Sequence, residues 1–380
     1  MKKILQRHLQ LNLAAKRSAF LWGPRRVGKS YWLRHTYPDY PKIDLLQSDV
    51  FLDYSARPAL LRERLIKAAK PIIIDEIQKI PMLLDEVHWL IENRGISFIL
   101  TGSSARKLKR GQANLLAGRA LRYEMTPLTY LEVTGFDIED VMISGMLPPF
   151  YLSDDPHQEL RSYVGDYLRE EIIAEARIQN IPSFSDFLRL AALTSGELIN
   201  YTNIGREAGI KTKIVREYFQ ILEDTLLGFR ISPWSKKQNR RMIETDKFYL
   251  FDVGLSNFLI QRQPKMGTPE FGKSFEHFVL MELRAYKAYK LPDLTISFWR
   301  TTTGLEVDFI LGDMQTAIEI KASKRVHETD LKILKILKQE YRVKKAILVC
   351  FETMPRQIDA IDILPWKIFI EKLWRGELVS

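Results

Sequence analysis

The sequence has little of what a secreted or membrane protein needs. Cys350 is the only cysteine in 380 residues, which excludes an internal disulfide framework and a zinc site built from several cysteines. No run of eighteen apolar residues occurs, and the basic N-terminus is not followed by an apolar segment, so we expect neither a membrane span nor a secretory signal. The six histidines are scattered without a metal-binding spacing. These features favour a cytoplasmic protein of two or three domains.

Acidic residues are also in deficit. The chain has 57 Lys and Arg against 47 Asp and Glu, a formal net charge of +10. This balance favours an anionic partner, with nucleic acid ahead of a membrane because the positive charge forms patches rather than one face of an apolar helix. A basic surface that is merely solvated is the alternative.

The apolar residues 19–22 are followed by the pattern G-x-x-x-x-G-K-[ST]. The glycines of this pattern allow consecutive backbone N–H groups to point at phosphate oxygens. Lys29 would neutralise the β- and γ-phosphates of ATP, and the Ser30 hydroxyl would ligate Mg²⁺. A glycine-containing turn with an exposed lysine is the alternative. The predicted nucleotide-binding residues are Gly23, Pro24, Arg25, Arg26, Val27, Gly28, Lys29 and Ser30.

Two further apolar runs end in polar residues. Residues 71–74 precede Asp75 and Glu76, as in a buried parallel strand that delivers carboxylates to its carboxyl end. Asp75 is the expected Mg²⁺ residue, and Glu76 would orient the attacking water. Residues 96–100 lead into a turn that contains Ser103, a candidate sensor of the γ-phosphate. Ordinary turns, with acids near a helix N-terminus in the first case, are the alternatives.

The middle of the chain is predicted to be helical. Residues 18–135 alternate strand and helix candidates, as in a parallel sheet with covering helices. A charged helical pattern covers residues 159–180, and a further helix is predicted from a Ser183 cap to a stop at Gly196. Residues 201–222 resemble a helix-turn-helix whose second helix is capped by Thr212.

Basic residues accumulate in and after this helix-turn-helix. No acid occurs over residues 225–243, where lysines and arginines surround Trp234, and a β-wing carrying them could grip a phosphate backbone. Helix-turn-helix units also pack against protein, so this alternative stays open. The candidate nucleic-acid contacts are Lys211, Lys213, Arg216, Lys236, Lys237, Arg240 and Arg241.

The C-terminal third contains a second set of polar residues. Glu319 and Lys321 are two apart in a predicted strand and share a face, and Asp308 lies on the strand before it. Glu276 lies on the helix that precedes both strands. The predicted order is helix 275–289, strands 295–299, 307–311 and 317–320, helix 331–337 and strand 346–351.

This arrangement resembles the PD-(D/E)XK nuclease core. The resemblance implies that Asp308 and Glu319 bind Mg²⁺, that Lys321 positions or activates the attacking water, and that Glu276 assists metal binding. No proline precedes the first acid, in contrast to the pattern that names the core. An ion-pair cluster at a sheet edge, or a nuclease fold kept as a docking platform, is the alternative.

Over nearly its whole length the sequence resembles a prokaryotic family of predicted AAA+ ATPases with a PD-(D/E)XK-like C-terminal domain of unknown function. The matching strings are GPRRVGKS, IIIDEIQKIP, LTGSS, LAGRA, YLFDVGL, GKSFEH and EVDFIL. The resemblance implies an α/β protein with a P-loop AAA+ core at residues 1–135, a helical lid at 136–182, a winged helix-turn-helix at 183–248 and the nuclease-like domain at 249–380. It also makes Arg119 a candidate sensor or finger for the γ-phosphate, with a surface salt bridge as the alternative.

These inferences lead to one main functional hypothesis. The protein would bind and hydrolyse ATP with Mg²⁺, bind DNA, and use its nucleotide state to control the C-terminal half. One alternative is an ATP-dependent signalling or assembly switch that recruits a protein partner, and a further alternative is a metal-dependent DNA nuclease. A homo-oligomer is possible if an arginine finger acts between subunits.

Overall fold

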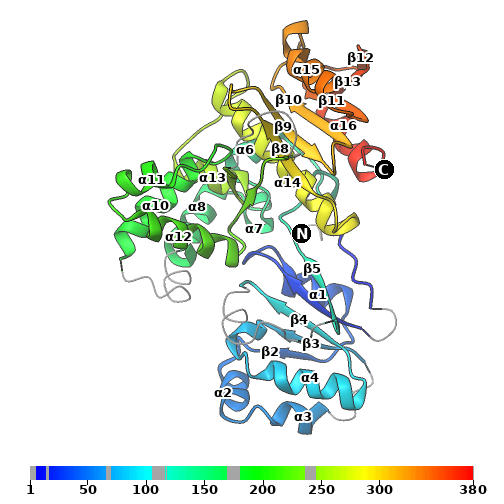
Figure 1. The fold of residues 1–380 in the computed structure, drawn as a ribbon. Coiled ribbons are helices and arrows are strands. Elements are labelled where there is room, and N and C mark those ends of the chain that lie inside the picture. The colour runs from blue at the N-terminus through cyan, green and yellow to red at the C-terminus, as the bar shows by residue number, and fades with distance from the viewer. Residues whose placement is uncertain are drawn as a thin grey trace.

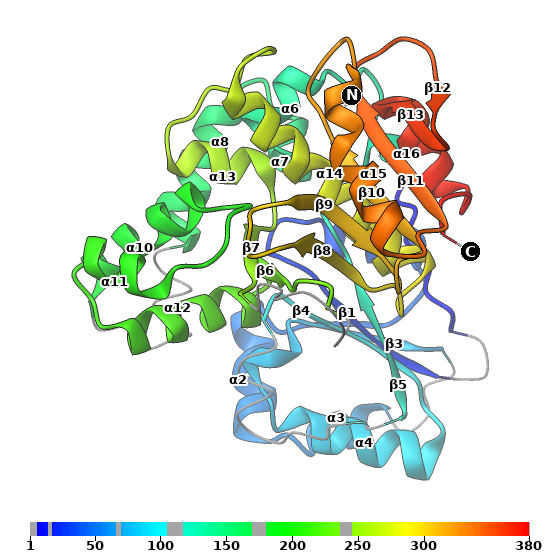
Figure 2. The ribbon, with the colours of Figure 1, turned by 45° about the horizontal axis from the view of Figure 1, so that its top comes forward.

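The computed structural model describes residues 6–13, 17–65, 70–104, 116, 118–168, 180–235 and 245–379. The chain forms an N-terminal α/β domain, a helical domain and a C-terminal α/β domain. The helical and C-terminal domains lie next to each other above the N-terminal domain in both views (Figures 1 and 2). Within the described residues, no helix is both long enough and apolar enough to span a membrane.

Parallel strands form the N-terminal sheet, as the alternating pattern of residues 18–135 predicts. The strand order is β2-β3-β4-β1-β5, so β4 separates the strand before the P-loop from the strand that ends in Asp75. The strands are β1 (Ser18–Trp22), β2 (Lys42–Asp44), β3 (Ile72–Asp75), β4 (Phe98–Gly102) and β5 (Ala120–Glu124), and the helices are α1 (Lys29–Thr36), α2 (Ser48–Ala56), α3 (Leu60–Leu65) and α4 (Leu83–Arg94).

The two faces of this sheet join different cores because successive side chains of a strand point in opposite directions. Phe20 and Ile74 pack with apolar residues of α2, α3 and α4 on one face. Leu21 and Ile73 belong to a core that contains Phe150 and further aromatic residues of the helical domain. The N-terminal sheet and the helical domain therefore share one hydrophobic core.

The helical domain follows β5 and ends in a β-hairpin and one more helix (Figure 2). Two strands, β6 and β7, pair in an antiparallel manner beside the helices. The elements are the 3₁₀ turn η3 (Tyr130–Glu132), α6 (Ile138–Ser144), α7 (Pro148–Tyr151), α8 (Pro156–Ser162), the π-helical turn η4 (Tyr163–Leu168), α10 (Ile181–Leu193), α11 (Tyr201–Glu207), α12 (Thr212–Asp224), β6 (Gly228–Ile231), β7 (Lys247–Leu250) and α13 (Val253–Leu259).

Two predicted helix caps are wrong in detail. The side chain of Asn180, not Ser183, caps α10 and accepts the Ser183 N–H at 3.1 Å, and the helix ends at Leu193. Asparagine competes well with serine at this position because its carbonyl reaches the same N–H groups. Thr212 is the first residue of α12, and Lys211 occupies the cap position without a side-chain bond.

A close crossing of α6 and α13 explains part of the YLFDVGL string. The Asp252 carboxylate caps α13 through the Leu255 N–H and also accepts the Met146 N–H at 2.8 Å. A Cβ on Gly254 would lie 2.1 Å from the backbone nitrogen of Gly145. A side chain at residue 254 is therefore excluded, and α13 packs closely against α6.

The C-terminal domain is a mixed sheet covered by helices on both faces. The order is β12-β13-β11-β10-β9-β8, with β10, β11 and β13 parallel. The predicted helix and strand order of residues 275–351 is confirmed, although α14 begins at Pro269, six residues before its predicted start. The elements are α14 (Pro269–Lys290), β8 (Ile296–Arg300), β9 (Glu306–Leu311), β10 (Thr316–Ile320), η5 (Glu328–Leu331), α15 (Lys332–Glu340), β11 (Lys345–Cys350), β12 (Arg356–Ile358), β13 (Ile361–Pro365) and α16 (Trp366–Trp374).

Candidate functional site

The P-loop connects β1 to the N-terminus of α1. Gly28 has φ +97°, a left-handed conformation that glycine adopts without strain, and α1 begins at the next residue. The buried Lys29 ammonium donates to the carbonyl oxygens of Gly23 at 2.7 Å and Pro24 at 3.1 Å. Burial lowers the pKa of Lys29 even though the carboxylates of Glu76 and Asp75 act in the opposite direction. These contacts hold the lysine beside the loop that would wrap a phosphate chain.

Asp75 lies at the carboxyl end of β3 within a set of donors. It accepts hydrogen bonds from the hydroxyl groups of Ser30 and Thr101 and forms an ion pair with Lys42 Nζ at 3.0 Å. Burial would raise the pKa of Asp75, but these three partners outweigh burial and lower it. Asp75 is therefore an ionised carboxylate beside the Ser30 hydroxyl, which is a donor set that fits a hydrated Mg²⁺ ion.

Glu76 is fixed by residues of the neighbouring strand. Its backbone has φ +61°, and its N–H donates to Thr101 Oγ1 at 3.1 Å. Its carboxylate accepts hydrogen bonds from Ser103 Oγ at 3.1 Å and from the Gln78 side-chain amide. Thr101 contacts both Asp75 and Glu76 because β4 lies next to β3. The structure thus brings the predicted residues Lys29, Ser30, Asp75, Glu76 and Ser103 to one edge of the sheet.

Sequence reasoning missed three members of this site. Lys42 is the basic partner of Asp75, and Gln78 and Thr101 orient Glu76. Gln78 could have been found from its position two residues after Glu76, and Thr101 from its position two residues before Ser103. Lys42 carries no local signal, because its contact with Asp75 exists only where β2 pairs with β3.

Arg119 lies at the opposite edge of the sheet. It immediately precedes β5, which runs parallel to β1, and its carbonyl accepts the N–H of Ser18 at the start of β1. The P-loop follows the other end of β1, roughly 13 Å away at about 3.3 Å per residue. The guanidinium pairs with Glu92 of α4. Arg119 therefore does not join the nucleotide site of its own chain, and a role between subunits stays a prediction.

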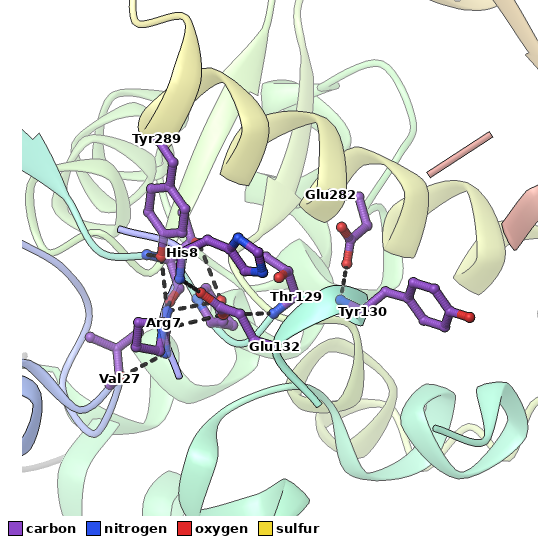
Figure 3. Close-up of polar contacts among 10 residues, drawn as sticks. Arg7, His8, Val27, Thr129, Tyr130, Glu132, Glu282 and Tyr289 are labelled. Atoms are coloured by element: carbon purple, nitrogen blue, oxygen red, sulfur yellow. Dashed lines mark hydrogen bonds and ion pairs between the residues drawn. The ribbon is translucent and has the colours of Figure 1, made fainter. Parts of the chain in front are cut away.

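Arg7 connects the P-loop to the segment after β5 and to α14 of the C-terminal domain (Figure 3). This buried guanidinium donates to the carbonyl oxygens of Val27 in the P-loop and Pro127 after β5, both at 3.3 Å. It also donates to the Tyr289 hydroxyl of α14 at 2.8 Å and forms a 3.2 Å ion pair with Glu132. We refer to Arg7, Glu132 and Tyr289 as the Arg7 junction. No sequence signal indicated this junction.

Glu282 extends the contact between these domains (Figure 3). Its carboxylate accepts the Tyr130 N–H at 2.7 Å and the Trp374 indole N–H at 3.0 Å. Burial raises the pKa of Glu282 from its usual 4.5 to about 7. One acidic side chain on α14 thus binds the segment after β5 and the last helix of the chain.

Glu282→Gln should change how stability depends on pH. Because the folded-state pKa is raised, the folded protein holds this proton more tightly than the unfolded chain, and the resulting stability is lost as pH rises from about 4.5 through about 7. The loss is at most about 3 kcal/mol. Glutamine does not titrate, so the free energy of unfolding of the variant should rise relative to that of the wild type across this pH range. Urea unfolding at pH 4.5 and 7.5 measures the free energy of unfolding of both proteins, and Glu207→Gln, at an exposed position, is the control. If the difference between Glu282→Gln and the wild type is the same at both pH values, the pKa of Glu282 is not raised.

The predicted acidic residues of the C-terminal domain also come together. Lys321 Nζ donates to Glu319 Oε1 at 2.7 Å, and Asp308 accepts the Ile320 N–H at 2.7 Å where the pairing of β9 with β10 ends. Burial raises the pKa of Asp308 well above its usual range, and Glu319 and Glu276 add to this effect. The three carboxylates predicted to bind metal therefore lie close enough to interact.

A lysine that sequence reasoning missed lies among these carboxylates. Lys247 of β7 is buried and forms ion pairs with Glu276 at 3.6 Å and with Glu306. Burial lowers the pKa of Lys247, but Glu276, Glu306 and Asp308 outweigh burial and raise it. Across the described residues, no group of three or more His, Cys, Asp or Glu side chains is arranged to hold a metal ion. The Mg²⁺ site at Glu276, Asp308 and Glu319 therefore stays a prediction, and Lys247 places a cation next to it.

The predicted nucleic-acid contacts are only partly described. Three of them are exposed at the start of α12: Lys211, Lys213 and Arg216. The guanidinium carbon of Arg216 lies 4.0 Å from the centroid of the Tyr201 ring. Trp234 instead packs on the C-terminal domain, where its indole N–H donates to Asp313 at 3.0 Å. The remaining four candidates, Lys236, Lys237, Arg240 and Arg241, lie outside the described residues.

Family models cover most of the chain in three segments. Residues 15–134, which contain the P-loop and Asp75, match the model described as an AAA domain. This match supports an AAA-type ATPase domain. Residues 135–266 and 271–369 match two models described only as domains of unknown function (DUF8612 and DUF4143). The nuclease resemblance of the C-terminal domain therefore stays a prediction.

The similar curated proteins are themselves uncharacterised. Proteins of Mycobacterium tuberculosis and Mycobacterium bovis are each 25% identical over 297 residues, or 76% of this chain and 66% of the relative, slightly under two thirds of its length. A Haemophilus influenzae protein is 23% identical over 90% of this chain and 91% of its own. A solved STAND (signal transduction ATPase with numerous domains) protein with a tetratricopeptide repeat sensor, from Pyrococcus horikoshii, is 14% identical over 74% of this chain and 48% of its own, with a TM-score of 0.21. A TM-score of 0.21 does not establish a common overall fold.

Proposed function

We propose that this protein is an ATP-hydrolysing switch that transmits its nucleotide state from the AAA domain to the helical and C-terminal domains. The observation that carries the proposal is the convergence of Lys29, Ser30, Asp75 and Glu76 at the carboxyl edge of one parallel sheet. This edge is where ligands bind in open parallel sheets. The AAA domain match over residues 15–134 supports the same function.

Each of the four side chains at this edge of the sheet has a defined part in the proposed reaction. The Lys29 ammonium exchanges the Gly23 and Pro24 carbonyls for β- and γ-phosphate oxygens, and the P-loop N–H groups bind the phosphate chain. Ser30 and Asp75 would hold Mg²⁺, which would neutralise phosphate charge when bound. Glu76, fixed by Ser103 and Gln78, orients a water toward the γ-phosphorus. Attack breaks the bond to the bridging oxygen and releases ADP and phosphate.

The Arg7 junction supports transmission of the nucleotide state to the other domains. The Val27 carbonyl lies inside the P-loop, and Arg7 connects it directly to Tyr289 of α14 and to Glu132. A second contact joins Arg26 of the P-loop to Glu159 of α8 at 3.2 Å. A change of P-loop conformation on binding ATP would therefore strain contacts with both neighbouring domains.

Nucleotide binding and phosphate release by the full chain test the proposal. We expect saturable binding of ATP with Mg²⁺ and release of phosphate at a rate well above that of a matched Lys29→Ala variant. Lys332→Ala, which removes an exposed lysine of α15, serves as the control for a general loss of charge. Absence of nucleotide binding at millimolar ATP would contradict the proposal.

A second candidate function is DNA binding by the helical domain. The supporting observation is the exposed cluster of Lys211, Lys213 and Arg216 at the N-terminal end of α12, the second helix of a helix-turn-helix arrangement. The net charge of +10 favours an anionic partner as well. In this proposal ATP state would control DNA engagement, whereas the alternative switch would recruit a protein through the same domain.

Lys211→Glu combined with Lys213→Glu should weaken DNA binding about 10-fold or more if these residues contact phosphates, and should reduce its salt dependence. Electrophoretic mobility shifts over a range of salt concentrations measure both effects. Lys332→Glu combined with Lys344→Glu changes the net charge equally at exposed positions of the C-terminal domain and serves as the control. Equal shifts for both double variants would exclude α12 as the contact surface.

A further inference from the structure

The carboxylate cluster of the C-terminal domain already contains a cation. Lys247 Nζ is buried and pairs with Glu276 from α14 and Glu306 from β9. Lys247 comes from β7, a strand of the helical domain rather than of the C-terminal sheet. The cation is therefore supplied by a neighbouring domain of the same chain.

The other members of the cluster also have partners, except that Glu319 Oε2 is buried without a hydrogen-bond partner among the described residues. Lys321 pairs with Glu319 at 2.7 Å, and Arg300 pairs with Glu306. Asp308 is engaged by the Ile320 N–H at 2.7 Å. A divalent ion would have to displace Lys247 or lie next to its positive charge, which opposes metal binding. A cavity of about 310 Å³ beside Lys247, Glu276 and Glu306 gives ions in solution a route to the cluster, so the prediction can be tested directly.

The β6–β7 hairpin also contacts the C-terminal domain through hydrogen bonds that do not involve the Lys247 side chain. After β6, the Trp234 N–H donates to the Phe298 carbonyl of β8 at 2.6 Å, and the Phe298 N–H donates to Ser232 at 3.3 Å. On β7, the Tyr249 hydroxyl donates to Glu276 at 2.6 Å. Residues 232–234 thus cover the edge strand of the C-terminal sheet, and Lys247 enters the carboxylate cluster from the other strand.

We propose that the carboxylate cluster is a cation site whose cation is the Lys247 ammonium instead of a divalent metal, and that it locks the β6–β7 hairpin onto the C-terminal domain. The chemistry resembles that of a nuclease metal site, but its ligand is an alkylammonium group of the same chain. The C-terminal domain then serves as a docking platform for the helical domain. This inference does not depend on ATP hydrolysis.

Mn²⁺ binding tests the identity of the cation. We expect the full-length protein and its Asp308→Asn variant to bind the same number of Mn²⁺ ions with affinities within about 2-fold, measured without nucleotide by electron paramagnetic resonance. An Asp75→Asn background removes a contribution from the AAA domain. One additional Mn²⁺ ion in the wild type that is lost in Asp308→Asn would overturn the proposal, because the cluster would then be a metal site.

Hydrogen exchange tests the lock itself. In Lys247→Met, amide exchange over 228–231 and 247–250 should accelerate about 10-fold or more, whereas Lys247→Arg, which keeps the cation, should change it less than about 3-fold. Unchanged exchange in Lys247→Met would overturn the proposal. If Lys247→Met fails to fold while Lys247→Arg folds with wild-type exchange, the requirement for a cation is supported. Equal acceleration in both variants would contradict it.

Discussion

Glu76→Gln should still bind ATP but hydrolyse it roughly 100-fold more slowly or worse. The amide keeps the size of the side chain and its contacts with Ser103 and Gln78, but it cannot accept a proton from water or polarise it as a carboxylate does. Because Lys29, Ser30 and Asp75 are unchanged, the nucleotide affinity should stay within a few-fold of wild type. The variant should therefore accumulate in the ATP-bound state.

Lys29→Ala provides the contrasting result. The substitution removes the Lys29 ammonium from the P-loop, so both the affinity for ATP and the rate of its hydrolysis should fall. Titration with a fluorescent ATP analogue separates affinity from turnover, which is followed by phosphate release. If Glu76→Gln hydrolyses ATP at the wild-type rate, Glu76 does not orient the water. If both variants do so, the assignment of the site is wrong.

Arg7→Met should destabilise the protein by about 3–5 kcal/mol. The change leaves Glu132 buried without its cation, and an uncompensated buried charge accounts for most of this cost. It also removes the donors to Val27 and Tyr289, so the P-loop loses its contact with α14. We expect lower nucleotide affinity as well, because the loop conformation is less restrained.

A double variant distinguishes the ion pair from the other contacts. Arg7→Met combined with Glu132→Gln removes both charges, and the amide oxygen introduced by Glu132→Gln can still accept one of the two N–H groups, from His8 or Thr129. The double variant should recover about half or more of the lost stability in urea unfolding, as expected when the unpaired charge dominates. Additive losses from the two single changes would show that the ion pair contributes little.

The Arg7 junction lies next to hydrophobic cores that join the domains. Leu21 and Ile73 of the AAA sheet pack in the same core as Phe150 of the helical domain, so these two parts are joined by apolar contact. The C-terminal domain meets the AAA domain through polar contacts, at Arg7 with Tyr289 and at Glu124 with Arg284. It also shares a buried apolar core with Leu128 and Val133, which follow β5. Both neighbouring domains are therefore joined to the AAA domain by polar and apolar contacts together.

Local sequence patterns were sufficient for much of the architecture. Short apolar runs followed by helix signals predicted the parallel strands of the AAA domain, and the spacing of glycines and acids predicted Lys29, Ser30, Asp75 and Glu76 at one edge. The same reasoning found the strand order around Asp308 and Glu319. Helix caps were less certain because several polar residues near a helix start compete for the same N–H groups, as Asn180 and Ser183 do.

The sequence by itself determined the elements and the residues whose chemistry follows from neighbours along the chain. The tertiary structure alone decided which distant charges meet. It places Arg119 far from the P-loop, because β1 and β5 are parallel. Arg119 precedes β5 and the P-loop follows β1, so the two lie at opposite edges of the sheet. It also placed Arg7 against Glu132 and Lys247 among the C-terminal carboxylates, partners 125 and 29 or more residues apart in the sequence. Ion pairs of this kind depend on how domains pack, and no period or motif along the chain encodes that packing.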